Sequence, residues 1–160
     1  MSAEQVDPAD RAAAAELLAR YAEAVDDGSF ETVGELLAAA VLEDAEGRPV
    51  AEGAEQIESL FRSTTRRHAD GTPMTTHLIT NVIVDAVGAD ELEVRSRFCV
   101  LQATDHLALQ PVVTGRYVDR MARRDGGWAF VRRRMVPEHW GDTSQHLTFD
   151  PAPDRGGQRT

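Results

Sequence analysis

The sequence contains no lysine, and all 17 of its basic side chains are arginines. A chain without lysine cannot form a Schiff base through its own side chain, hold pyridoxal phosphate covalently or supply the lysine of a phosphate-binding loop. Serine nucleophile elbows, glycine-rich phosphate loops and paired cysteines are also absent. These absences leave proton transfer on a bound organic molecule as the enzyme chemistry that is most open.

Cysteine and long apolar runs are equally scarce. Cys99 is the single cysteine, so we expect a packed thiol, and nothing indicates an oxidising compartment. No run approaches the roughly 18 apolar residues that a membrane span needs, and the first residues lack the features of a signal peptide. We therefore expect a cytoplasmic location and no membrane partner. The histidines lie at no recognised metal-ligand spacing, so no metal site and no cofactor are predicted.

The charge balance argues against nucleic acid as a partner. The net charge is −10, whereas phosphate binding is driven largely by basic side chains. The run Arg132, Arg133 and Arg134 alternates between the two faces of a predicted strand, and we interpret these arginines as solvated or ion-paired surface groups. With 42% apolar and 28% charged residues over 160 positions, the composition is that of one globular domain.

The first part of the chain has the periodicity of helices. Asp7 and Pro8 are suited to a helix start, and apolar residues then recur at three- and four-residue spacing as far as about residue 27, where Gly28 stops the helix. Ser29 can cap a second short helix. Residues 41–52 predict a small hairpin that turns at Glu46 and Gly47, and residues 54–68 predict a third helix.

The second part of the chain has the residue pattern of β-strands. Residues 75–87, 92–104, 109–123 and 128–136 are rich in β-branched and aromatic side chains, and short turn-forming segments separate them. Such short links predict an antiparallel meander, and long twisted strands tend to curl. We predict an α+β fold, a cone-shaped barrel in which three N-terminal helices pack on a curved antiparallel sheet of four long strands plus a short hairpin. The domain is expected to span residues 1–147, followed by a disordered tail, 148–160.

Asp26 and His77 are the residues best placed for chemistry. Asp26 borders the apolar stripe of the first helix, where a carboxylate without a partner is partly desolvated. The alternative is that Asp26 or Asp27 caps the turn into Gly28 and Ser29. His77 shares a largely apolar strand face with Asn81, and histidine titrates near neutrality, so His77 could act as a general base. The alternative is a histidine that is merely hydrogen-bonded in the core.

Other polar and aromatic side chains are candidates for binding a substrate. Tyr21, Gln102 and Tyr117 could line a pocket, and each could equally be an ordinary interior or interface residue. The full set of substrate-binding candidates is Tyr21, Gln102, Tyr117, Asn81, Phe98 and Trp140.

The predicted order of elements resembles the nuclear transport factor 2-like superfamily over residues 8–147, and within it the SnoaL-like and scytalone dehydratase-like branch. Three segments carry the resemblance: 21–30, the helix end with Asp26; 76–81, the strand with His77; and 127–130 followed by 139–142. The resemblance implies an acid–base pair at Asp26 and His77. It departs where Gln102 stands in place of the dehydratase's second histidine, and where Gly115 and Tyr117 replace a serine and an asparagine.

The resemblance implies a cofactor-independent dehydratase, cyclase or isomerase that acts on a small polyketide-like or aromatic metabolite, with His77 and Asp26 as the catalytic pair. It also implies a homodimer formed through the outer face of the sheet. The branch is similar as well to the small subunit of ring-hydroxylating dioxygenases, which is structural. A non-catalytic binding or assembly subunit is therefore the alternative function.

Overall fold

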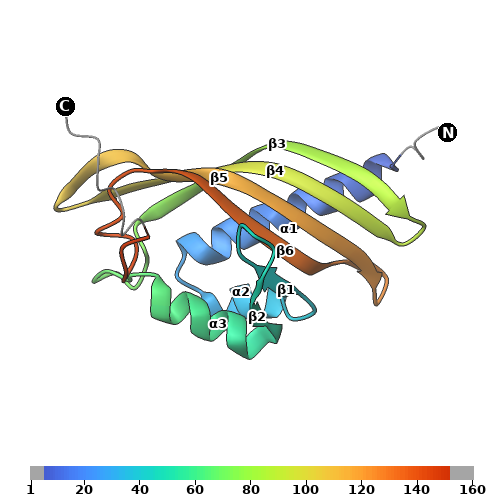
Figure 1. Ribbon diagram of the computed structural model, residues 1–160, viewed down its shortest axis with the longest axis horizontal. Helices are drawn as coiled ribbons and strands as arrows, with labels where there is room; N and C mark the ends of the chain where they lie inside the picture. Colours follow the sequence, from blue (N-terminus) through green and yellow to red (C-terminus); the bar gives the residue numbers. More distant parts are fainter. Residues whose placement is uncertain (1–5, 152–160) are drawn as a thin grey trace.

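The computed structural model describes residues 6–151, and its elements follow the predicted order (Figure 1). The helices and strands are α1 (Pro8–Asp26), α2 (Phe30–Leu36), β1 (Val41–Glu43), β2 (Pro49–Glu52), α3 (Gly53–Thr64), β3 (Thr75–Gly88), β4 (Glu91–Thr104), β5 (Leu107–Arg124) and β6 (Gly127–Trp140).

Helix α1 begins and ends as the sequence predicts. The Asp7 carboxylate accepts a hydrogen bond from the Ala9 amide at 2.8 Å, and Pro8 occupies the first turn. At the other end Gly28 adopts a positive φ of 69° and its amide donates to the Val25 carbonyl. Ser29 occupies the N-cap position of α2, but its side chain makes no capping hydrogen bond.

Helix α3 is shorter at its C-terminal end than the predicted range, 54–68. It ends at Thr64 because Thr65 is extended and forms an isolated bridge with Leu147, while the Arg66 amide donates to the His146 carbonyl at 2.8 Å. The backbone groups of Thr65 and Arg66, which would otherwise continue the helix, therefore pair with the chain after β6 instead. Such long-range pairing cannot be recognised from local periodicity.

The strands form one six-stranded sheet in the order β2-β1-β6-β5-β4-β3. The four long strands pair as a consecutive antiparallel meander, as predicted. The hairpin β1–β2 joins the free edge of β6 by parallel pairing of β1, with Leu42 opposite Arg133, so the complete sheet is mixed. The sheet is curved and does not close on itself (Figure 1).

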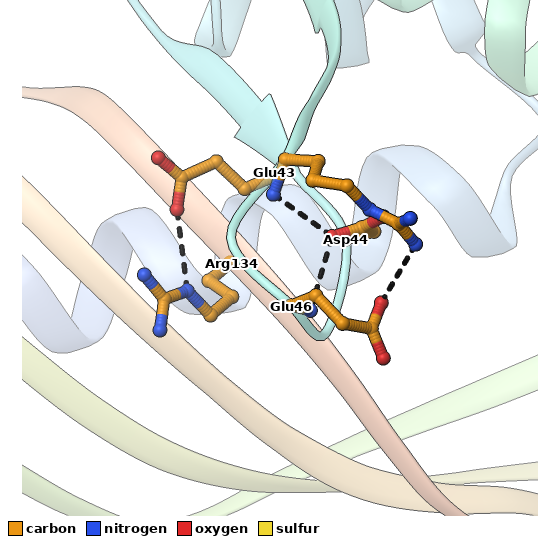
Figure 2. A network of polar contacts seen from close by, with 5 residues as sticks. Glu43, Asp44, Glu46 and Arg134 are labelled. Carbon is orange, nitrogen blue, oxygen red and sulfur yellow. Dashed lines mark hydrogen bonds and ion pairs between the residues drawn. The ribbon is translucent and has the colours of Figure 1, made fainter.

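Polar contacts fix the hairpin against β6, as Figure 2 shows. The Asp44 carboxylate accepts hydrogen bonds from the backbone amides of Glu46 and Arg48 at 3.0 and 2.9 Å, which closes the turn. From β1, the Glu43 carboxylate accepts a hydrogen bond from Nε of Arg134 on β6 at 3.2 Å. These contacts hold the short parallel strand at the edge of the sheet.

The helices cover the concave face of the sheet, with α1 running along the long strands and α2 and α3 beneath them (Figure 1). Apolar side chains from both layers form a single core, in which the Phe30 and Phe61 rings lie 6.0 Å apart and Tyr21 meets Phe61 edge-on at 6.3 Å. Three helices packed on a curved sheet confirm the predicted α+β cone. No helix in the described part of the chain is long and apolar enough to cross a membrane.

The chain remains folded beyond residue 147, where the predicted tail begins. The Thr148 amide donates to the Thr64 carbonyl at 3.0 Å, and its hydroxyl donates to the Ser63 carbonyl at 2.7 Å. Phe149 lies against the pocket described below. The rest of the predicted tail, 152–160, lies outside the described residues.

Candidate active site

The end of α1 places Asp26 next to the start of β3. A Cβ atom at Gly28 would lie 2.5 Å from the Gly71 carbonyl oxygen, and Gly28 also has a positive φ, so only glycine lets the helix end approach this loop so closely. The chain then enters β3 at Thr75. Residues 49 and 51 positions apart in the sequence are thereby brought into hydrogen-bonding distance.

The Asp26 carboxylate accepts three hydrogen bonds from β3. Oδ1 accepts from the Thr75 hydroxyl at 2.8 Å, Oδ2 accepts from the His77 amide at 2.8 Å, and Oδ1 lies 2.6 Å from His77 Nδ1. The carboxylate therefore fixes the backbone and the ring of His77 together. The alternative that Asp26 or Asp27 caps the turn into Gly28 does not hold for Asp26, because its oxygens point to β3, whereas Asp27 is the C-cap residue of α1.

These contacts keep Asp26 ionised and set the orientation of His77. Burial alone would raise the pKa of Asp26, but the hydrogen bonds and charge of His77, with the Thr75 hydroxyl, hold that pKa below its ordinary value. An ionised carboxylate only accepts hydrogen bonds, so Nδ1 of His77 carries the proton. In its uncharged form the ring has a lone pair at Nε2, for which the described residues offer no hydrogen-bond partner.

His77 lines a pocket of about 270 Å³ between the helices and the concave face of the sheet. Most of its lining is apolar and aromatic, which is typical of sites for small organic ligands. The polar side chains that reach it are few and convergent: Tyr21, Thr64, Thr65, His77, Tyr117 and His146. The His77 side chain is only 6% exposed, so a ligand that reaches it is largely removed from water.

A buried ion pair supports the tyrosines of the pocket. Arg133 and Asp119 face each other across β5 and β6, are fully buried, and form two hydrogen bonds of 2.8 Å each. The Arg133 guanidinium lies 4.0 Å from the Tyr21 ring centroid and 4.2 Å from that of Tyr117. Burial raises the pKa of both tyrosines, so their hydroxyls stay protonated.

Arg133 thereby corrects the interpretation of the arginine run as a surface feature. Its neighbour Arg134 is ion-paired with Glu43, as expected, but Arg133 is 0% exposed. The signal was present in the alternation, because Arg133 points to the opposite face from Arg132 and Arg134. In β5, Asp119 lies two residues from Tyr117 and so shares its face. Recognising the pair required the register between the two strands.

Four of the predicted substrate-binding residues line the pocket: Tyr21, Phe98, Tyr117 and Trp140. Phe98 stacks on Tyr117 with ring centroids 4.5 Å apart. A Cβ atom at Gly115, opposite Phe98, would lie 2.6 Å from that ring and 2.3 Å from the Val136 carbonyl oxygen. The Phe98 ring thus fills the space that a serine at position 115 would need.

Gln102 and Asn81 were named as substrate-binding candidates, but neither is among the residues that line this pocket. Gln102 is buried, and its Nε2 donates to the Pro73 and Gln145 carbonyls at 2.9 Å each, so it ties two loops together. Asn81 is exposed and has a φ of 54° beside an irregularity in the pairing of β3 with β4. That irregularity breaks the alternation from which Asn81 was assigned to the face of His77.

His146 was missed as a site residue. It lies in the segment after β6, is 7% exposed, and lines the same pocket as His77. Burial and the neighbouring His77 lower its pKa to about 4. No local pattern in the sequence indicates this placement, because the segment has neither helical nor strand periodicity. Within residues 6–151, no three histidine, cysteine or acidic side chains form a group that could hold a metal ion.

The comparisons with known proteins agree with the fold. Among curated proteins none matches the sequence. A protein of unknown function with a cystatin-like fold, from Nostoc punctiforme, is 20% identical, with a TM-score of 0.70, and the match covers 84% of this chain and 96% of that one. A proposed scytalone dehydratase from Novosphingobium aromaticivorans is 21% identical, with a TM-score of 0.67 and coverages of 84% and 87%.

The β subunit of a proposed aromatic-ring-hydroxylating dioxygenase from Novosphingobium aromaticivorans is also similar. It is 17% identical, with a TM-score of 0.64, over 85% of this chain and 94% of that one. At these identities the likeness concerns the fold. The sequence family known as the SnoaL-like domain matches residues 7–134, which is most of the chain. This protein therefore belongs to the SnoaL-like domain family.

Proposed function

We propose that this protein is a cofactor-independent lyase or isomerase that moves a proton on a small polyketide-like or aromatic metabolite. The observation that carries the proposal is the Asp26–His77 pair, with 2.6 Å between carboxylate and ring nitrogen, at the wall of an apolar pocket. The pair leaves one imidazole nitrogen available to a ligand. A non-catalytic subunit would need neither an ionised carboxylate behind a histidine nor space in front of it.

The chemistry follows from the state of the two side chains. His77 Nε2 takes a proton from a carbon beside a carbonyl group, and the C–H electron pair becomes that of an enolate. The Asp26 carboxylate stabilises the imidazolium that forms. In dehydration the enolate pair then forms the C=C bond, the C–O bond of the β-hydroxyl breaks, and that oxygen leaves as water with the proton from His77. In isomerisation the proton returns to another carbon.

The similarity in fold to a proposed scytalone dehydratase and the aromatic lining of the pocket support an aromatic or polyketide-like substrate. Tyr21 and Tyr117 would contact its polar groups, and Phe98 and Trp140 its rings. Dehydration, cyclisation and isomerisation share the same first proton transfer. They would differ in where the leaving or attacking group lies on the substrate.

The test uses α-tetralone and its β-hydroxy derivative as probes in heavy water. Wild-type protein is expected to exchange the α-protons of the ketone and to eliminate water from the hydroxy derivative, as followed by proton NMR and mass spectrometry. His77→Ala and Asp26→Asn should lose about 10² to 10⁴-fold in rate, which is the usual contribution of positioned acid–base catalysis. His106→Ala is the matched control, because His106 lies in an exposed turn.

Near-normal rates in a folded His77→Ala protein would contradict the proposed mechanism. The alternative is a binding or assembly subunit, and similarity to the dioxygenase β subunit favours it. It predicts that wild-type and His77→Ala proteins are equally inactive on both probes.

A further inference from the structure

The second imidazole of the pocket, that of His146, has no hydrogen-bond partner for its ring among the described residues. Its Nδ1 is buried and unpaired, and no hydrogen bond of the described residues engages its Nε2. Buried polar atoms without partners are rare, and each one calls for an explanation. The position is not loose, because the segment that carries His146 is held by hydrogen bonds on both sides.

We name residues 143–148 the strap. On its side facing α3, the Arg66 amide donates to the His146 carbonyl at 2.8 Å, and Arg66 Nε donates to the Leu147 carbonyl at 2.7 Å. The Gln145 carbonyl lies 2.9 Å from both Gln102 Nε2 and His68 Nε2. Internally, the His146 amide donates to the Thr143 carbonyl at 2.9 Å. The strap is thus built into the fold, and it presents His146 to the pocket.

The surroundings of His146 indicate where its proton resides. A buried N–H without an acceptor is rarer than an unsatisfied acceptor atom. The unpaired and buried Nδ1 therefore favours the tautomer with the proton on Nε2. Because burial lowers the pKa of His146 to about 4, the ring is neutral at neutral pH and carries this one N–H. A neutral imidazole can donate a hydrogen bond to a carbonyl oxygen while negative charge develops there.

We propose that His146 binds the oxygen of the ligand, donating from Nε2, and that the pocket selects apolar ketones whose acidic C–H lies beside that oxygen. His77 supplies a proton acceptor and His146 a hydrogen-bond donor to one pocket. An H–C–C=O unit offers a proton to the first group and an acceptor oxygen to the second. The binding of the oxygen stands on the geometry of His146, whereas the selection of an acidic C–H rests on the proposed function.

The test compares α-tetralone with tetralin, which has the same skeleton without the oxygen. Calorimetry is expected to show that wild-type protein binds the ketone more tightly, and that His146→Phe loses about tenfold of this preference, as one hydrogen bond would supply. His146→Gln retains a donor and should restore part of the preference. His106→Phe, at an exposed turn, is the matched control and should keep all of it.

Nitrogen NMR of the wild-type imidazoles provides a second readout that needs no variant. Addition of α-tetralone should shift the protonated Nε2 of His146. The proposal is overturned if wild-type protein binds the two probes equally, if His146→Phe keeps the preference for the ketone, or if only the His77 nitrogens shift. If the wild-type protein prefers the ketone but does not exchange its α-protons, the proposed function is overturned, and His146 remains the group that binds the oxygen.

Discussion

His77 and His146 are the same residue type in one pocket, yet their surroundings give them different chemistry. Three hydrogen bonds to Asp26 involve β3, and one of them fixes the His77 ring and its proton. His146 has no such partner, and burial in an apolar site favours its uncharged form. These different surroundings are why we propose that His77 accepts a proton and that His146 donates a hydrogen bond, although both are histidines.

The buried state of His146 predicts a loss of stability in mild acid. The unfolded chain binds a proton at this histidine below about pH 6.5, whereas the folded protein does so only near pH 4. The unfolded state therefore holds more protons in that window, and the free energy of unfolding falls as the pH falls through it. The decrease should be about 3 kcal/mol, and His146→Phe should show a clearly smaller one.

Urea unfolding at a series of pH values between these limits measures the effect. His106→Phe should behave like the wild type, because His106 is exposed. An equal loss of stability in wild type and His146→Phe would show that other groups, and not His146, carry the acid dependence.

At this scale the sequence predicted part of the site. Asp26 and His77 stand out because they interrupt apolar faces of a helix and a strand, and that signal is local. Arg133 and His146 do not stand out, because their burial depends on partners outside their own segments. These are Asp119 on the adjacent strand β5 and the loops that hold the strap. Gln102 was expected to line a pocket or to be an ordinary interior residue, and it is an interior residue because it binds carbonyls in those same loops.

Among the elements, β5 contains a position with very little space for a side chain. Gly115 lies where the neighbouring strands bring the Phe98 ring and the Val136 carbonyl close to its backbone. Since the carbonyl belongs to a strand that is paired along its length, it cannot move far. The aromatic wall of the pocket therefore depends on the absence of a side chain at this position.

We predict that Gly115→Ala destabilises the protein by about 1–3 kcal/mol, towards the upper end, because an added carbon overpacks the site. Gly127→Ala is the matched control, since a Cβ atom there meets nothing within 4 Å, and its effect should stay within about 0.5 kcal/mol. Thermal and urea unfolding measure both. Equal stability of the two variants would mean that β5 and β6 can separate at low cost.

The elements were predictable to different degrees for a physical reason. The helix starts, the hairpin and the turns of the meander depend on local signals, such as Asp7 before Pro8 or the turn at Asp105 and His106, and these agree with the structure. The end of α3 and the parallel pairing of β1 with β6 depend on contacts between distant segments, and neither was predicted.

On the scale of the whole molecule, the outer face of the sheet has a charged part and an apolar part. Towards β5 and β6 it carries ion pairs, such as the contacts of Glu138 with Arg97 and Arg116. On the edge strand β3 it exposes apolar side chains, with Leu78 44% and Ile83 48% exposed. The homodimer expected from the resemblance stays a prediction, and this apolar edge is where we propose that two copies meet.

Leu78→Glu should therefore shift a dimer towards monomer, because it places a charge in the proposed contact. Val50→Glu, on β2 at the opposite edge of the sheet, is the control and should leave the mass unchanged. Light scattering coupled to size exclusion measures both. A wild-type monomer, or a dimer that persists in Leu78→Glu, would contradict this placement of the interface.

The strap also has a consequence for how the protein is made. The contacts of residues 145–148 with Ser63, Arg66 and His68 span 77 to 85 positions in the sequence. A ribosome releases the helices and most of the meander before it releases the strap, so the nascent chain can form the acid–base pair of Asp26 and His77 early. Until residues 143–148 emerge, the pocket lacks His146. On our proposals, the proton acceptor is therefore in place before the group that binds the ligand oxygen.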